Sequence, residues 1–335
     1  MRLHYLDNLK VFLIVLVIFH HAGQAYGDGG GWAYHPSNPE EVMPWIWHFF
    51  STNAAFFMGL YFLISGYFVP TSFDKQGVVR FVWKKSLRLG VPLLLIGALF
   101  SSLSGKFEIG HMWFVEILLF FCLVYAVIRL IVKPISRERP SKPTLLGLLL
   151  VGVLMGIGSH FIRQVSPQDH WINFMGLIFE PAHSLQYVMM FVLGILARRM
   201  GWIEAMDCRT SLMAFIIGIA LAIGNYLVDD HAWGHFVWQW FGIYESLLCI
   251  FISTGLLWLF RAFCNKSSRF LKWCSAQSYG AYVFHLPLML ILQHATDSLW
   301  MGAFGKFMFI GIVITIVSFV FTWLVRLIPG IKKIL

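Results

Sequence analysis

Charged side chains are scarce in this 335-residue chain, where Asp, Glu, Lys and Arg together make up only 12% of the sequence. Soluble globular domains carry about 25% charged residues, so this composition excludes that class. Hydrophobic residues reach 59%, aromatic residues reach 17%, and the mean hydropathy is +0.73. These values predict a polytopic membrane protein, folded as an all-α bundle of transmembrane helices.

Cysteine is also rare, and its placement argues against a disulfide framework. Of the five cysteines, Cys122 and Cys249 fall in apolar segments, and Cys208, Cys264 and Cys274 fall on the expected cytoplasmic side, which is reducing. The histidines show no paired ligand spacing with cysteine, so no metal site is predicted. A Gly-x-Ser-x-Gly elbow is missing as well, which leaves no serine nucleophile to propose.

Apolar segments long enough to cross a membrane recur along the whole chain. About ten are predicted, near 8–27, 46–69, 86–104, 112–132, 144–162, 182–199, 210–228, 236–260, 278–296 and 306–328. Pro92 and Pro287 interrupt the third and the ninth, and a kink is expected at each. We expect residues 1–335 to form a single membrane domain with no separate soluble domain.

The basic residues orient this bundle. Of the 25 Lys and Arg residues, only Lys106, Arg163 and Lys306 fall on or near one side of the predicted membrane. This asymmetry is a strong positive-inside signal, and an even number of spans puts both termini in the cytoplasm. The net charge of +9 is therefore mostly a matter of topology, and it does not indicate a nucleic-acid partner.

The expected outer segments are rich in aromatic residues and short polar groups. They comprise 27–45, 165–183 and 229–240, and the last two include Trp171, Glu180, His183 and Trp238. Aromatic rings beside small polar groups are typical of sugar-binding surfaces, but tryptophan belts also form at any membrane interface. Both interpretations remain open.

The first predicted span carries ionisable groups, which are costly in a membrane and therefore indicate function. Lys10 and His21 are eleven residues apart, so a helix returns them to one face about 16 Å apart along its axis. His20 points about 80° away. A cleaved signal peptide is disfavoured because Asp7 lies in its would-be basic region and two histidines precede its exit. Asp7 is expected to pair with Lys10 or Arg88.

Five stretches in register resemble the acyltransferase-3 family of integral membrane O-acyltransferases. They are Leu6-Asp7-Asn8-Leu9-Lys10 with His20-His21, the segment Phe56–Phe68 with its Ser65-Gly66-Tyr67, Lys85-Ser86-Leu87-Arg88, His111-Met112-Trp113-Phe114, and Ser278-Tyr279-Gly280-Ala281-Tyr282-Val283-Phe284-His285. The resemblance covers nearly the whole chain. Lys10 and Lys85 stand where the family usually has arginine, and lysine does not reproduce the bidentate phosphate contacts of arginine.

The resemblance implies a membrane enzyme of a bacterial inner membrane that uses acyl-CoA as co-substrate and has no tightly bound cofactor. It would move an acyl group, acetyl or succinyl, from cytoplasmic acyl-CoA to a hydroxyl of an extracytoplasmic carbohydrate or glycolipid. Lys10, Lys84, Lys85 and Arg88 are the expected acyl-CoA-binding residues, although flanking charge of this kind also follows from membrane orientation alone.

His21 is the leading catalytic candidate, because a neutral imidazole suits deprotonation of a hydroxyl. His20 and Glu116 are further catalytic candidates, and a histidine bonded between helices is the alternative for each imidazole. Glu116 and Glu245 should face the bundle interior, where either could neutralise a base, orient the histidine or line a polar passage. His111, Trp113, Glu245 and His285 are predicted to line the substrate or to pack.

A second function class remains open. A proton-coupled secondary transporter would also place His and Glu inside the bundle beside broken helices. We find no internal repeat between 1–160 and 180–335, which argues against a transporter. A non-catalytic scaffold is disfavoured because His21 and the basic motif are both present.

Overall fold

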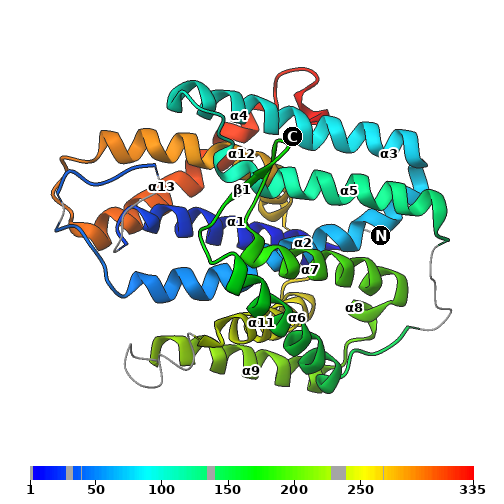
Figure 1. Cartoon of the computed structure of the whole chain (residues 1–335). Helices are drawn as coiled ribbons and strands as arrows, with labels where there is room; N and C mark the ends of the chain where they lie inside the picture. The colour runs from blue at the N-terminus through cyan, green and yellow to red at the C-terminus, as the bar shows by residue number, and fades with distance from the viewer. Residues whose placement is uncertain (1–2, 28–32, 39, 134–139, 228–238, 267) are drawn as a thin grey trace. The chain divides into compact units, whose positions relative to one another are not determined.

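The computed structural model describes residues 3–27, 33–38, 40–133, 140–227, 239–266 and 268–335, and within these the chain is mostly helical (Figure 1). The predicted outer residues 28–32, 39 and 229–238 lie outside the described part. The long helices are α1 (His4–Gln24), α2 (Ile46–Gln76), α3 (Val78–Lys85), α4 (Val91–Ser104), α5 (Trp113–Ile131), α6 (Leu145–Val165), α7 (Pro181–Met200), α9 (Cys208–Leu227), α11 (Phe241–Phe263), α12 (Arg269–Ala295) and α13 (Gly302–Val325).

Short elements connect them. These are the π-helical turn η1 (Ser86–Gly90), the 3-10 turns η2 (Gly110–Met112) and η3 (Ile331–Lys333), helix α8 (Trp202–Ala205), and the antiparallel hairpin of β1 (Ile172–Phe174) and β2 (Leu177–Phe179).

Each predicted span contains a helix, so the all-α polytopic bundle is confirmed. Among the described residues, 8 helical segments are long and apolar enough to cross a membrane. α7 and α12 fall short because polar side chains interrupt them.

The third span differs from its prediction, because its helix begins at Val78 rather than near 86. α3 passes through the wider turn η1 into α4, and Pro92 lies in the first turn of α4. Pro287 lies inside α12, which continues on both sides of it.

The contacts group the chain into two compact units, residues 1–54 with 263–335, and residues 55–262. In the first unit α1, α12 and α13 pack against one another (Figure 1). Small residues allow this packing, since a Cβ at Gly280 would overlap Thr322 and one at Gly311 would overlap Phe19. The buried Asn8 amide donates to the carbonyl of Cys264, with nitrogen and oxygen 2.7 Å apart, and so ties α1 to the start of this unit's second segment.

In the second unit α2 and α7 approach each other closely. A Cβ at Gly66 would overlap the backbone carbonyl of Phe191, and one at Gly194 would overlap the carbonyl of Leu63. Gly66 and Gly194 therefore permit the close approach of these two helices. Around this crossing, the Phe62 ring lies 4.7 Å from that of Phe114 between centroids, which brings α5 into the same core.

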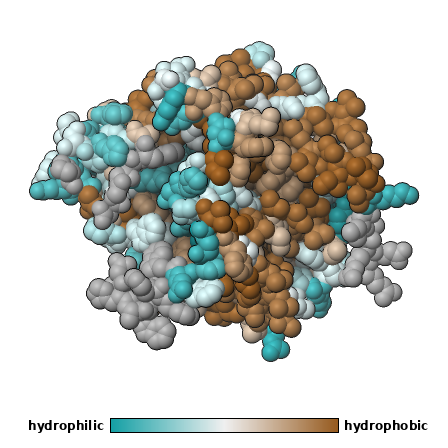
Figure 2. All heavy atoms as spheres, viewed as in Figure 1, coloured by the Kyte–Doolittle hydropathy of each residue, from teal (hydrophilic) through white to brown (hydrophobic). Residues whose placement is uncertain are grey.

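The outward faces of the spans are apolar. On the face seen in Figure 2, hydrophobic side chains form a broad surface over the region where Figure 1 shows α3 to α5. The exposed residues of α5 include Phe120, Val124, Val127 and Ile131, which recur at helical spacing. Such a stripe suits contact with lipid chains and agrees with a membrane location.

Between α1 and α2, the described residues Tyr34, Ser37 and Glu41 are held by two charged residues, Lys306 and Asp297. Lys306 is only 2% exposed, and its Nζ donates to the Glu41 carboxylate at 2.7 Å and to the Asp297 carbonyl at 2.6 Å. The Asp297 carboxylate accepts hydrogen bonds from the Ser37 and Tyr34 hydroxyls and from the Ser37 N–H. The Ser37 bonds, followed by the Tyr34 bond, lower the pKa of Asp297 to about 2.

We expect Gly66→Ala to destabilise the protein, because the new methyl group would meet a backbone carbonyl that cannot rotate away. Overpacking of this kind costs about 1–3 kcal/mol. The matched control is Gly224→Ala in α9, where a Cβ would meet nothing within 4 Å. Thermal unfolding in detergent should show a lower Tm for Gly66→Ala alone, and equal Tm values would contradict this account of the α2–α7 crossing.

We expect Asp297→Asn to lower the Tm at neutral pH, because an amide cannot accept all three hydrogen bonds. A carboxyl with a depressed folded-state pKa stabilises the fold above its unfolded pKa of about 3.9, and this contribution disappears as the pH falls toward the folded value. The Tm difference from wild type should therefore narrow between about pH 4 and pH 2. Glu40→Gln, an exposed acid of the same loop, is the control and should show little difference at any pH.

Candidate active site

Two histidines from distant parts of the sequence meet in the first unit. His21 lies in the last turn of α1, and His285 lies within α12 and is completely buried. The His21 Nδ1 and His285 Nε2 atoms are 2.7 Å apart, whereas the ring centroids are 5.0 Å apart and the ring planes differ by 1°. Because the nitrogens are much closer than the centroids, the parallel rings meet edge to edge through a hydrogen bond.

The partners of His285 assign the protons of this pair. Its Nδ1 lies 2.6 Å from the Tyr282 backbone oxygen, which can only accept, so Nδ1 carries a hydrogen. Full burial disfavours an imidazolium, so the neutral ring has its lone pair on Nε2. His21 must then donate through Nδ1, and a neutral His21 has its own lone pair on Nε2. The arrangement therefore prepares the Nε2 of His21 to accept a proton.

The neighbouring His20 occupies a different environment. It is only 8% exposed and its ring meets that of Phe50 edge to face, with centroids 5.1 Å apart. His21 is half-buried, and its ring is therefore the more accessible of the two. This difference supports the preference for His21 that the register with Lys10 suggested, and it gives His20 a packing contact.

The other end of α1 carries the expected ion pair. Lys10 Nζ lies 2.9 Å from the Asp7 carboxylate, with side-chain exposures of 31% and 15%. The predicted pairing of Asp7 with Lys10 is confirmed.

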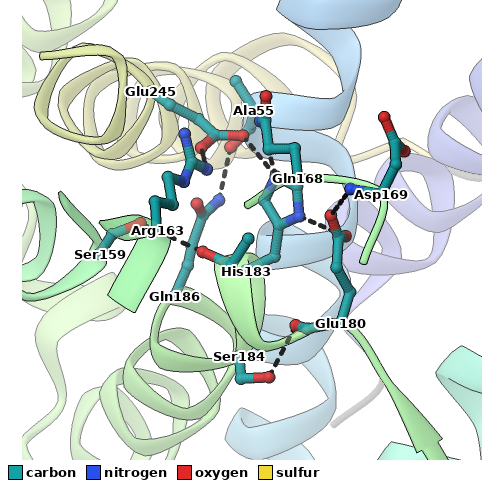
Figure 3. Close-up of polar contacts among 11 residues, drawn as sticks. Ala55, Ser159, Arg163, Gln168, Asp169, Glu180, His183, Ser184, Gln186 and Glu245 are labelled. Atoms are coloured by element: carbon teal, nitrogen blue, oxygen red, sulfur yellow. Dashed lines mark hydrogen bonds and ion pairs between the residues drawn. The ribbon is translucent and has the colours of Figure 1, made fainter. Parts of the chain in front are cut away.

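The second unit contains a buried cluster of charges (Figure 3). It includes Glu245, which is 1% exposed and pairs with Arg163, as expected of an interior acid that neutralises a base. His183, at the start of α7, lies with Nδ1 2.5 Å from the Glu180 carboxylate and Nε2 3.0 Å from that of Glu245 in α11. Arg163, at the end of α6, pairs with the other oxygen of Glu245. We call Arg163, Glu180, His183 and Glu245 the charge cluster.

The hydrogen-bond partners of His183 show which groups of this cluster are charged. Both ring nitrogens of His183 face carboxylate oxygens, so both donate and the ring is an imidazolium. Two acids and two bases then balance inside a site where an unpaired charge would be very costly. Glu180 also accepts from the backbone N–H of Asp169 at 2.7 Å, which ties the loop before the hairpin to α7.

Glu116 and Trp113 lie beside the hairpin of the same unit. The Glu116 carboxylate accepts from the N–H of Ile178 at 2.9 Å, and so anchors β2 to α5. The Trp113 ring stacks on Tyr187, with centroids 5.4 Å apart, and lines an apolar cavity of about 290 Å³ between α5, α7 and the hairpin. His111 is 2% exposed and packs edge to face on Phe100. A catalytic role for Glu116 and a substrate contact for His111 or Trp113 stay predictions.

The basic motif lies around the π turn. Lys84 and Arg88 are exposed, and the half-buried Lys85 places its Nζ 5.6 Å from the centroid of the Phe81 ring. Lys84 lies in the last turn of α3, and Arg88 lies within the π turn η1 that follows it. Their acyl-CoA-binding role stays a prediction.

Sequence reasoning missed two features of these sites. His285 was expected to line substrate or to pack, whereas the structure gives it the hydrogen bond to His21, a pairing across 264 positions of sequence. Glu180 and His183 were assigned to an aromatic outer segment, yet they are buried in the charge cluster. The available signal was Arg163, an exception to the charge asymmetry, together with the i, i+3 spacing of Glu180 and His183.

The fold and these buried polar pairs are those of a multi-pass membrane protein, and comparison with known proteins gives its class. A family model described as an acyltransferase domain matches residues 3–323, so the chain belongs to the acyltransferase-3 family. Relatives called glucans biosynthesis protein C, from Salmonella paratyphi B, Salmonella enteritidis PT4 and Salmonella schwarzengrund, are 26% identical over 340 residues. These alignments cover 90% of this chain and 84% of each relative. No solved structure matches the chain significantly.

We expect Arg163→Met to destabilise the protein strongly, because it leaves the charge cluster with two buried carboxylates and only one cation, the His183 imidazolium. Breaking a buried ion pair in this way costs about 3–5 kcal/mol. The double variant Arg163→Met with Glu245→Gln should recover much of that loss, since it removes the uncompensated charge. Thermal unfolding of both variants and of Glu245→Gln completes the cycle, and purely additive losses would show that the two groups are not coupled.

Proposed function

We propose that this protein is an O-acyltransferase that moves an acyl group from acyl-CoA to a hydroxyl of an extracytoplasmic carbohydrate. The observation that carries this proposal is the hydrogen-bonded pair of His21 and His285, within a chain of the acyltransferase-3 family. The pair offers what acyl transfer to a hydroxyl needs, a neutral imidazole whose lone-pair nitrogen is fixed by its partners.

The chemistry follows from the proton positions. Nε2 of His21 accepts the proton of the acceptor hydroxyl while that oxygen attacks the carbonyl carbon of the thioester. The carbon–sulfur bond then breaks, and the departing thiolate takes the proton back from His21 Nε2, which regenerates the neutral ring. General-base assistance of this kind contributes about 10²- to 10⁴-fold in rate.

His285 acts on this reaction through His21. It accepts the Nδ1–H of His21 and is itself held by the Tyr282 carbonyl, so it fixes both the tautomer and the ring orientation of the base. The bond strengthens as His21 becomes positively charged, because hydrogen bonds to ionised groups are stronger than neutral ones. His285 is therefore a positioning residue in this proposal.

The donor and acceptor rest on different observations. Lys10, Lys84, Lys85 and Arg88 supply positive charge that suits the phosphates of coenzyme A, on the side that the charge pattern assigns to the cytoplasm. The name of the relatives, glucans biosynthesis protein C, supports a glucan as the carbohydrate acceptor. An acetyl or succinyl group is the acyl group we propose.

Four variants separate the proposed roles. His21→Ala should lower kcat by about 10²- to 10⁴-fold and leave coenzyme A binding unchanged. Arg88→Ala should weaken coenzyme A binding, measured as loss of the Tm increase that this ligand gives the wild type.

His285→Ala should lower kcat less than His21→Ala does, and His285→Gln should restore part of the rate, because its amide oxygen can accept the Nδ1–H of His21.

The contradicting outcomes are distinct. Transfer from acetyl-CoA or succinyl-CoA to a glucan that persists in His21→Ala would overturn the assignment of the base. Absence of any Tm shift with coenzyme A, acetyl-CoA or succinyl-CoA in the wild type would overturn the donor, and proton-flux measurements would then test the transporter alternative.

A further inference from the structure

A basic cavity of about 410 Å³ lies in the first unit, between the start of α12 and the end of α13. Three cationic side chains line it, those of Lys272, Arg326 and Lys332, together with the rings of Trp273 and Trp323. Among the described residues that line it there is no acid. The acyl transfer proposed above uses none of these residues.

The backbone brings the three cations together from separate elements. Lys272 comes from the first turns of α12, and Arg326 is the residue that caps the end of α13. After α13 the chain turns back through Gly330, whose φ of 89° lies in the left-handed region that glycine tolerates. This turn places η3, and with it Lys332, beside the ends of both helices.

Arg326 is fixed in position within the cavity wall. Its guanidinium donates to the Gln277 side-chain oxygen at 2.8 Å and to the carbonyl of Ala276, both on α12. Lys272 and Lys332 are exposed, so their ammonium groups can move onto a ligand. One preorganised cation and two adaptable ones suit a phosphate, which accepts hydrogen bonds on several oxygens.

The tryptophans indicate where such a phosphate would come from. Trp323 is 42% exposed on α13, a helix that is apolar enough to cross a membrane, and Trp273 is half-buried on α12. Tryptophan rings prefer the level of lipid headgroups, and the charge pattern assigns this end of both helices to the cytoplasmic side. Basic pockets between helices on that side suit the headgroups of anionic lipids.

We propose that this cavity binds the phosphate headgroup of an anionic phospholipid of the cytoplasmic leaflet. The phosphate lies against Arg326, Lys272 and Lys332, while Trp273 and Trp323 flank the glycerol region. This site is independent of acyl transfer. The same phosphate chemistry could instead be met by coenzyme A, and the experiment therefore includes both ligands.

The test uses the full chain purified in detergent, with phosphatidylglycerol and phosphatidylcholine of identical acyl chains added at equal concentration. The cavity variant is Lys272→Gln with Lys332→Gln, which changes only exposed side chains. The matched control is Lys133→Gln with Lys142→Gln, which removes the same charge from two other exposed lysines of the expected cytoplasmic side. The readouts are the Tm and the number of lipids retained in native mass spectrometry.

Phosphatidylglycerol should raise the Tm of wild type and control by several degrees, because a ligand that binds only the folded state stabilises it. The cavity variant should lose most of this shift and retain one lipid fewer, and phosphatidylcholine should have little effect on any of the three proteins. An equal shift in all three proteins, or no shift in any, would overturn the proposal. So would a shift that coenzyme A gives and the cavity variant loses, since the cavity would then be a nucleotide-phosphate site.

Discussion

Polar groups within a membrane bundle must find their partners inside the protein, and the most informative parts of this structure follow from that constraint. In water an unpaired histidine or glutamate would be solvated, but in a bundle each needs a neighbour on another helix. His21 finds His285, and Arg163 finds Glu245. The sites of this protein are therefore formed by two or more helices rather than by single motifs.

The two buried polar sites solve this constraint differently. The histidine pair is neutral and directional, because the Tyr282 carbonyl sets the tautomer of His285 and His285 sets that of His21. The charge cluster is ionic, with an imidazolium and a guanidinium balancing two carboxylates. A neutral pair retains a lone pair for proton transfer, whereas a compensated ionic cluster holds its helices and the neighbouring loop in place. The first geometry suits catalysis and the second suits structure.

Close helix contacts complete the scaffold around these sites. Without an apolar driving force between helices in lipid, association depends on van der Waals fit and on small residues at the crossings. Gly66 and Gly194 serve this role between α2 and α7, and Gly280 and Gly311 serve it around α13. The outward stripe of α5 is apolar instead, because in a bilayer it contacts lipid chains and needs no protein partner.

The sequence by itself determined the all-α class, the approximate positions of the spans and the family, because hydropathy and short motifs are local properties. The register of Lys10 with His21 is local as well, and it made α1 the leading candidate. The sequence did not predict the early start of α3, since propensity does not reveal the π turn that joins α3 to α4. Only the tertiary structure decided that His285 is hydrogen-bonded to His21 and that Glu245 neutralises Arg163. It also decided that Lys332 lies beside Lys272 in the wall of one cavity. These contacts join residues far apart in the chain, and no periodicity within one helix encodes its partner on another.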